Sequence, residues 1–134
     1  MSNTSMSLWQ QLGIEEKLIQ ILHDIPDAAP EHHFGRPFLT AYQIAIEYAR
    51  LFPQDVAQLD VPVGGAGTGQ RSSLAQYLAG QLSRRIKAGT LPRVEGGFLS
   101  NQHLDDIRFD AGDKIIRSSL TDTEYTLSMF RLRD

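Results

Sequence analysis

The sequence predicts an α+β fold, in which three to four helices are followed by a small antiparallel β-hairpin or three-stranded meander. Apolar residues recur at helical spacing in three stretches before residue 89. After residue 107 the spacing changes to the alternation that is typical of a β-strand. Glycine and proline residues separate these stretches, as they do between elements of a folded domain.

Composition and length predict one domain covering residues 1–134. Of its 134 residues, 41% are hydrophobic and 22% are charged, which is ordinary for a folded soluble protein. There is no cysteine, so disulfides, thiolate metal sites and cysteine nucleophiles are excluded. The first residues have neither the basic patch nor the apolar stretch of a secretory signal, and no run is long enough to span a membrane. We therefore expect a soluble cytoplasmic protein with a flexible tail at residues 1–5.

The first helical stretch begins near Leu8, where apolar residues start to recur at spacings of one, three and four. Gly13 interrupts the pattern. This predicts either one helix with a weak point or a short turn followed by a helix from about Ile14. Pro26 ends the stretch, because the residue before a proline is disfavoured in helical conformation.

A proline-rich loop is predicted at residues 25–37, and two of the four histidines lie in it. The histidines are His23, His32, His33 and His103. His32 and His33 are adjacent to Glu31, but neighbouring residues of a regular element point to different faces and do not easily chelate one ion. No histidine spacing matches a metal site. The sequence favours a solvated loop and predicts no metal or cofactor, and it does not tell whether the four histidines converge.

The second helix has a clear start. Thr40 and Gln43 match the capping box, in which each side chain bonds a free backbone N–H, although Pro37 at the first helical position is an alternative. Pro53 is expected to end the helix, and residues 53–60 to add one further turn. Its apolar side chains cover most of its circumference: Phe38, Tyr42, Ile44, Ile46, Tyr48, Ala49, Leu51 and Phe52. Such a helix belongs in the middle of a domain, so core packing is favoured over a ligand site for its tyrosines.

A glycine-rich loop is predicted at residues 60–72. Gly64 and Gly69 have the spacing of a nucleotide-binding loop, but Gln70 and Arg71 replace the lysine and the hydroxyl residue that such a loop requires. A nucleotide hydrolase is therefore excluded. A weaker hypothesis remains, in which loop N–H groups and a helix dipole bind a phosphate or carboxylate. Its candidate residues are Gly67, Gly69, Ser72 and Ser73. The alternative is a mobile loop whose glycines permit a tight path.

The third helix is the best specified. Ser73 and Gln76 match a second capping box, and Gly89 supplies a left-handed cap at the other end. Four residues at four-residue spacing define its buried face: Leu74, Leu78, Leu82 and Ile86.

Charge is distributed unevenly. Residues 1–60 carry eight acids and three bases, and residues 95–134 carry eight acids and five bases. Residues 61–94 have no acid and five bases: Arg71, Arg84, Arg85, Lys87 and Arg93. Such a segment indicates an anionic partner, but basic residues near a helix C-terminus are also favoured by the helix dipole alone.

In the C-terminal third, residues 90–99 predict an extended segment broken by Pro92 and by Gly96-Gly97. Residues 101–107 predict a brief helix capped by Ser100 or Asn101. Three strands are expected over residues 107–110, 114–120 and 125–132, with turns between them. Four acids fall in or beside the first turn, where aspartate is favoured, and do not match a calcium loop: Asp105, Asp106, Asp110 and Asp113.

The order of helices, basic helix and hairpin resembles the winged-helix layout, in which a helix enters the major groove and the hairpin contacts the backbone. The sequence thus predicts a non-enzymatic domain that binds nucleic acid through the five basic residues. A long loop before the helix, an acidic hairpin tip and a net charge of −3 argue against this function. The alternative is a module that binds an anionic small ligand at the glycine loop, or pairs with a second copy through an exposed strand edge such as Tyr125 to Leu132.

Overall fold

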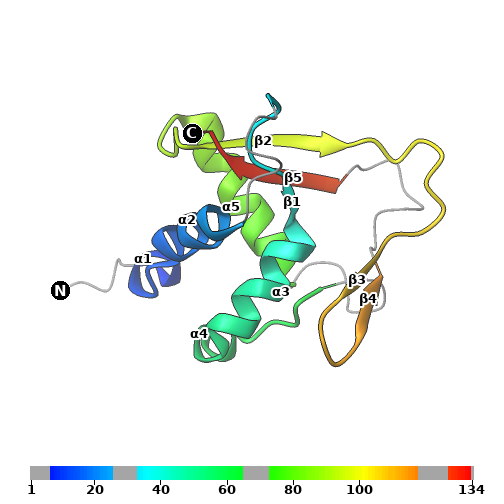
Figure 1. The fold of residues 1–134 in the computed structure, drawn as a ribbon. Coiled ribbons are helices and arrows are strands. Elements are labelled where there is room, and N and C mark those ends of the chain that lie inside the picture. Colours follow the sequence, from blue (N-terminus) through cyan, green and yellow to red (C-terminus); the bar gives the residue numbers. More distant parts are fainter. Residues whose placement is uncertain (1–6, 26–32, 65–72, 118–126, 134) are drawn as a thin grey trace.

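The computed structural model describes residues 7–25, 33–64, 73–117 and 127–133, and it confirms the α+β class. The helices of this part are α1 (Leu8–Gln11), α2 (Ile14–Asp24), α3 (Ala41–Leu51), α4 (Pro53–Leu59) and α5 (Leu74–Ala88). The strands are β1 (Leu39–Thr40), β2 (Val94–Leu99), β3 (Arg108–Asp110), β4 (Ile115–Arg117) and β5 (Leu127–Leu132). The helices lie together on one side of the sheet formed by β1, β5 and β2, and the β3–β4 hairpin lies apart from that sheet (Figure 1).

The predicted tail at residues 1–5 and the predicted turn at residues 121–124 lie outside the described residues. So does most of the predicted glycine loop. Among the helices that are described, none has the length and hydrophobicity needed to cross a membrane.

Gly13 divides the N-terminal helical stretch in two. It adopts a left-handed φ of 61°, which separates α1 from α2 and confirms the second of the two predicted alternatives. Helix α1 begins with a capping box between Ser7 and Gln10. The buried residues of α2 recur at helical spacing, and they face the core.

The predicted start of α3 is confirmed. The Gln43 backbone N–H donates to Thr40 Oγ1 at 3.3 Å, and the Thr40 N–H donates to Gln43 Oε1 at 2.8 Å. Thr40 also belongs to β1, a two-residue strand that the sequence pattern did not reveal. Pro53 ends α3 as expected, but it is the first residue of α4, which is longer than a single turn.

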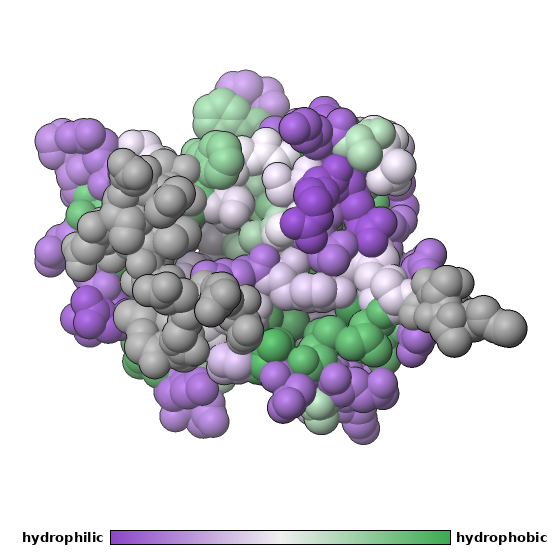
Figure 2. Space-filling view, turned by 180° about the vertical axis from the view of Figure 1, so that it is seen from behind, coloured by the Kyte–Doolittle hydropathy of each residue, from purple (hydrophilic) through white to green (hydrophobic). Residues whose placement is uncertain are grey.

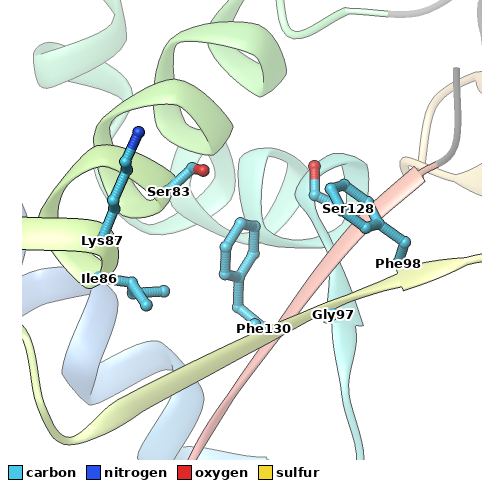
Figure 3. A pocket seen from close by; sticks show the side chains of 8 residues that line it. Ser83, Ile86, Lys87, Gly97, Phe98, Ser128 and Phe130 are labelled. Atoms are coloured by element: carbon cyan, nitrogen blue, oxygen red, sulfur yellow. The ribbon is translucent and has the colours of Figure 1, made fainter.

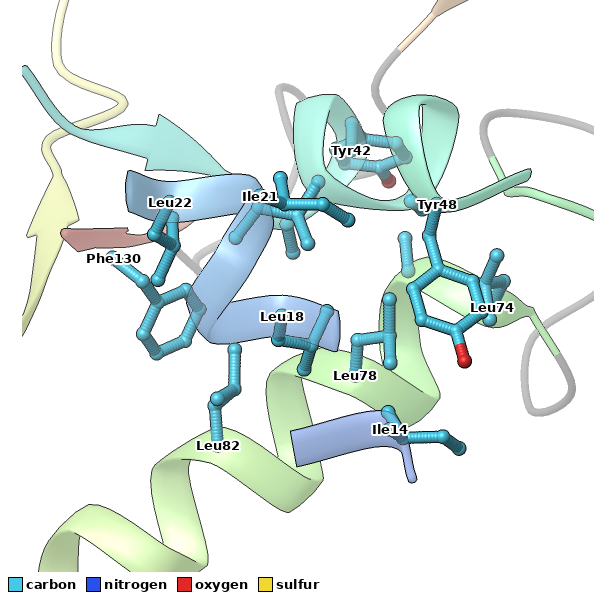
Figure 4. Packing of buried hydrophobic residues seen from close by; sticks show 14 of the residues in the cluster. Ile14, Leu18, Ile21, Leu22, Tyr42, Tyr48, Leu74, Leu78, Leu82 and Phe130 are labelled. Atoms are coloured by element: carbon cyan, nitrogen blue, oxygen red, sulfur yellow. The ribbon is translucent and has the colours of Figure 1, made fainter. Parts of the chain in front are cut away.

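The core lies where α2, α3 and α5 meet the sheet (Figure 4). Figure 4 shows the leucines of α5 pointing toward side chains of α2 and α3, with Phe130 of β5 at one end of the cluster. The fully buried side chains include Ile14, Leu18, Ile44, Tyr48, Leu74, Leu78, Leu82 and Val94. Burial of these residues is the main source of the stability of the fold.

Strand β5 is the middle strand of the sheet, whose order is β1-β5-β2 with both pairs antiparallel. The prediction of an exposed edge at Tyr125 to Leu132 is therefore wrong for Leu127–Leu132, which has a partner strand on each side. The edge strands are β1 and β2. Strand β2 also runs unbroken through Gly96 and Gly97, where the sequence predicted a break.

The predicted hairpin is confirmed in β3 and β4, which pair around Phe109 and Ile116. The third strand of the predicted meander, β5, joins the other sheet instead. The hairpin contacts the helices through Phe109, whose ring stacks on Tyr42 with centroids 5.1 Å apart.

The brief helix predicted at residues 101–107 is absent. His103 has a left-handed φ of 63°, which is incompatible with a helix at this position. The local bonds are those of turns, from the Gln102 N–H to Ser100 Oγ at 3.0 Å and from the Leu104 N–H to the Asn101 carbonyl at 3.2 Å.

Arg131 of β5 holds the segment before β1 against the sheet. Its Nη1 donates to the carbonyl oxygens of Phe34 at 2.7 Å and Arg36 at 3.0 Å. Its guanidinium also lies over the Phe38 ring at 4.3 Å and pairs with Glu95 of β2. One side chain thus connects both edge strands to the middle strand.

Candidate functional site

Helix α5 carries three of the predicted basic residues, and the structure separates them. An exposed stripe runs along the helix through Gln76, Ser83, Arg84 and Lys87. Arg84 and Lys87 are close on this stripe, because three residues correspond to 300° of helical rotation, or 60° of separation. Arg85 is 160° away from Lys87 by the same geometry, and it faces α1.

Arg85 is a packing residue in this structure. Its guanidinium lies 4.3 Å from the centre of the Trp9 ring, and its Nη2 donates to Gln81 Oε1 at 3.1 Å. The Nε atom is buried and has no partner among the described residues. Burial raises the pKa of Tyr77, and the nearby Arg85 and Arg84 charges oppose that shift. The basic segment therefore does not form one continuous surface.

Arg93 is exposed in the connection between α5 and β2. Its carbonyl oxygen accepts from the Arg133 N–H at 2.8 Å, so its backbone is fixed while its side chain remains at the surface. Arg71, the fifth predicted basic residue, lies outside the described residues.

The first turn of α5 has few donors left for an anion. Ser73 is buried and its hydroxyl accepts from the Gln76 N–H at 3.1 Å, which is one half of the predicted capping box. The Leu74 N–H donates to the Pro62 carbonyl at 2.7 Å, and the Ala75 N–H to the Val63 carbonyl at 2.9 Å. These three N–H groups are thus removed from the predicted anion site. Its other residues lie outside the described part: Gly67, Gly69 and Ser72.

A groove of about 400 Å³ lies between α5 and the sheet. Its lining residues come from α5, β2 and β5: Ser83, Ile86, Lys87, Gly96, Gly97, Phe98, Ser128 and Phe130. Figure 3 shows the Phe130 ring between the α5 side chains on one side and Phe98 and Ser128 on the other. We call this feature the α5–β2 groove.

Gly96 leaves the α5–β2 groove open. A Cβ atom at this position would lie 3.4 Å from the Phe130 ring and 3.6 Å from Ile86 Cδ1, so a larger side chain would fill the floor of the groove. Phe98 stands on the same face of β2, two residues further on, and is 73% exposed. The groove thus combines apolar walls with one cationic side chain, Lys87, at its rim.

A buried polar cluster joins α2, α3 and α4. Asp55 Oδ2 accepts from the Tyr48 hydroxyl and from Lys17 Nζ, both at 2.6 Å. Burial, with the hydrogen bond to Asp55, raises the pKa of Tyr48 strongly. Lys17 also lies 4.7 Å from the centre of the Phe52 ring. Since each polar group has a partner and the site lies inside the helical layer, this cluster is structural.

The hairpin carries its own charge cluster. Asp106 accepts from Arg108 Nε at 3.1 Å and from Arg117 Nε at 3.2 Å. The hydrogen bond from Arg108, and then that from Arg117, holds the pKa of Asp106 below its usual range. Asp110 bonds the Gly112 N–H at 2.8 Å, which is the local turn bond expected of aspartate.

The histidines do not form a metal site in the part of the chain that is described. His23 lies on α2, with Nδ1 3.4 Å from Asp24 Oδ1, and the His33 ring contacts the Phe34 ring with centroids 4.6 Å apart. His103 occupies a turn, and His32 lies outside the described residues. No three His, Asp or Glu side chains in the described ranges are close enough to hold a metal ion.

The α5–β2 groove was missed from the sequence, although a signal for it exists. Gly96 and Phe98 lie on one face of an extended segment, next to a helix whose last large apolar residue is Ile86.

Seen from behind, the surface of the molecule carries separate hydrophilic and hydrophobic patches (Figure 2). Comparisons with protein-family models, with curated proteins and with solved structures found no match to this chain.

Proposed function

We propose that this chain is a non-enzymatic nucleic-acid-binding domain, with α5 as the helix that faces the nucleic acid. The observation that carries the proposal is the exposed stripe of α5. Arg84 and Lys87 lie on it without an acidic residue on the same helix, and neither forms an ion pair with a described residue. Unpaired cations on an exposed helix attract phosphate groups.

The order of the elements supports the same proposal. Helix α5 is followed by β2 and β5, an antiparallel pair that lies side by side in the sheet. The connection between these two strands, residues 100–126, includes the β3–β4 hairpin and has the place in the chain that a wing has in a winged-helix arrangement. Beside the hairpin, Asp106 pairs with both Arg108 and Arg117, so we assign the main phosphate contacts to α5.

Two or three cations limit the strength of this interaction. Each phosphate that is neutralised contributes about one unit to the dependence of the logarithm of the affinity on the logarithm of the salt concentration. If Arg84, Lys87 and Arg93 each contact a phosphate, we expect weak binding. The logarithm of the affinity should fall with the logarithm of the salt concentration with a slope of about −2 to −3, and the affinity should depend little on base sequence.

The test is fluorescence anisotropy with a labelled DNA duplex and a labelled single-stranded RNA over a series of salt concentrations. Arg84→Glu and Lys87→Glu should each weaken binding and reduce the salt slope by about 1. Arg50→Glu is the control, because it makes the same change of charge at an exposed position on α3, where the arginine is already paired with Glu47 and is not expected to contact phosphate. Absence of binding at low salt, or an equal loss in the control, contradicts the proposal.

The α5–β2 groove favours a second function, which is binding of a small ligand that has an apolar group and an anionic group. Its volume is within the range of ligand sites, Phe130 and Phe98 supply apolar contacts, and Lys87 lies at the rim. A thermal-shift screen with aromatic carboxylates and phosphorylated metabolites tests this function, since a ligand of the folded state raises the melting temperature. A true ligand should lose its effect in Lys87→Ala but not in Arg50→Ala. If no compound raises the melting temperature, the groove does not serve this function.

A further inference from the structure

Strand β2 has a free backbone edge. It is paired on one side only within the described residues, with β5. The Arg133 N–H donates to the Arg93 carbonyl at 2.8 Å, one step beyond the Val94–Leu132 pair in the same register. Hydrogen-bonded and non-hydrogen-bonded pairs alternate along an antiparallel ladder. The N–H and C=O groups of Gly96 and Phe98 therefore point away from β5, toward the free edge.

In the described part of the chain, this edge lacks the features that usually prevent strand pairing. Edge strands are commonly protected by proline, by unpaired charges or by a covering element. The β2 strand contains no proline, and its one charged residue, Glu95, is already paired with Arg131 and Arg133. Phe98 is 73% exposed and Leu99 is 37% exposed, so the strand also presents apolar side chains.

The same strand contains an exposed aromatic side chain and one wall of a groove. Phe98 projects from the face of the sheet that α5 partly covers, and the α5–β2 groove lies on that face at Gly96. Within the sheet, Phe130 of β5 lies opposite Gly96 and its ring is next to the glycine. The Phe98 ring of a second copy would approach Gly96 from the free edge and contact the Phe130 ring in the groove.

We propose that two copies of this chain pair through β2, antiparallel and about a two-fold axis at Gly97. In this register Phe98 of each copy lies opposite Gly96 of the second copy and enters its α5–β2 groove. Both residues direct their backbone groups to the free edge, so the register also forms hydrogen bonds. Glu95 lies opposite Leu99 of the second copy, which keeps the two Glu95 carboxylates apart. The surface is self-complementary, as an interface with two-fold symmetry requires.

The size of the contact sets the expected affinity. A stable interface of standard size uses about 20 to 30 residues from each partner. The proposed interface uses the six residues of β2 and the α5 residues at the groove, so we expect a weak dimer that forms in the micromolar range or above. Both copies of α5 would lie on one face of the joined sheet. The dimer does not depend on the proposed nucleic-acid function.

Analytical ultracentrifugation over a wide concentration range tests the association. The parent protein should show a monomer–dimer equilibrium, and Phe98→Lys should raise the dissociation constant roughly 30-fold or more, because each dimer loses two central aromatic contacts. Ile115→Lys is the matched control, since Ile115 is 59% exposed on β4, away from β2. A parent protein that stays monomeric at every concentration, or equal effects of the two variants, overturns the proposal.

A single cysteine tests the register, because the chain has none of its own. Gly97→Cys would place two thiols at the two-fold axis, in a non-hydrogen-bonded pair with Cα atoms about 4.5 Å apart, which is within the range of a disulfide. The position tolerates a side chain, since a Cβ at Gly97 meets no atom within 4 Å. Mild oxidation should give a covalent dimer much faster than for Ala57→Cys, an exposed position on α4. Equal rates would exclude this register. Circular dichroism verifies that each variant is folded.

Discussion

Helix α5 is packed differently toward the other helices and toward the sheet. On the side of α2 and α3, the side chains of Leu74, Leu78 and Leu82 are almost completely buried. On the side of β2, Ile86 and Lys87 face Gly96, and the α5–β2 groove of about 400 Å³ remains. The leucines of α5 are enclosed because α2 and α3 supply side chains opposite them. Where the neighbour supplies glycine, a binding surface is left.

Truncating a leucine on the filled side should have the largest effect. Leu78→Ala is expected to lower the free energy of unfolding by about 3 kcal/mol, since Leu78 is 0% exposed and its removal leaves a cavity. Ile86→Ala should cost about 1 kcal/mol, because Ile86 already borders an open groove and loses fewer contacts. Urea denaturation measures both values. Equal losses would mean that the two sides of α5 are packed alike.

The polar cluster on the helical side should give an effect of intermediate size. Tyr48→Phe removes the 2.6 Å hydrogen bond to buried Asp55 and should cost about 2 kcal/mol. Burial and this bond raise the pKa of Tyr48 in the folded state above its unfolded value. Its contribution is therefore complete below about pH 10 and is lost as the pH rises further. Parent and variant should converge in stability above pH 10, and a constant difference up to pH 11.5 would contradict this assignment.

The glycines should give the smallest effects, with opposite signs. Gly97→Ala is expected to raise the free energy of unfolding by about 0.5 kcal/mol, since a Cβ there meets open space and the unfolded chain becomes less flexible. Gly89→Ala should lower it by about 1 kcal/mol, because Gly89 ends α5 with a φ of 77°. Thermal unfolding of both variants measures the difference. A loss of stability in Gly97→Ala would show that the space next to Gly97 is not open.

The filled side of α5 could be predicted from the sequence because its determinants are local. Ser73, the leucines at four-residue spacing and Gly89 all fall within one short segment, and the structure has each of them in the expected place. The start of α3 at Thr40 could be predicted for the same reason, because Thr40 and Gln43 are three residues apart. Caps and apolar periodicity act over a few residues, so a linear pattern is sufficient to identify them.

The sheet side could not be predicted, because strand pairing is decided by distant residues. Strand β1 has only two residues, and its partners in β5 are Met129 and Phe130. No local pattern identifies such a strand. The Gly96-Gly97 pair predicted a break, but the β5 residues opposite it hold the strand in register. The groove depends on this pairing and was therefore missed as well.

The candidate basic surface was predicted in part. The absence of acids from residues 61–94 identified Arg84 and Lys87, which the structure places together on the exposed stripe. Helical spacing already separates Arg85 from Lys87 by 160°, but only the position of Trp9 in α1 shows that Arg85 is a packing residue.

The central position of β5 has a consequence for how the chain folds as it is synthesised. Both edge strands depend on it, and Arg131 bonds carbonyl oxygens that lie 97 and 95 residues earlier. Domains emerge from the ribosome N-terminus first, and contacts between distant residues form slowly. The helices can therefore associate while β1 and β2 still have no partner. The sheet is completed in one late step, when residues 127–132 become available, and until then both edges of β2 are exposed to other nascent chains.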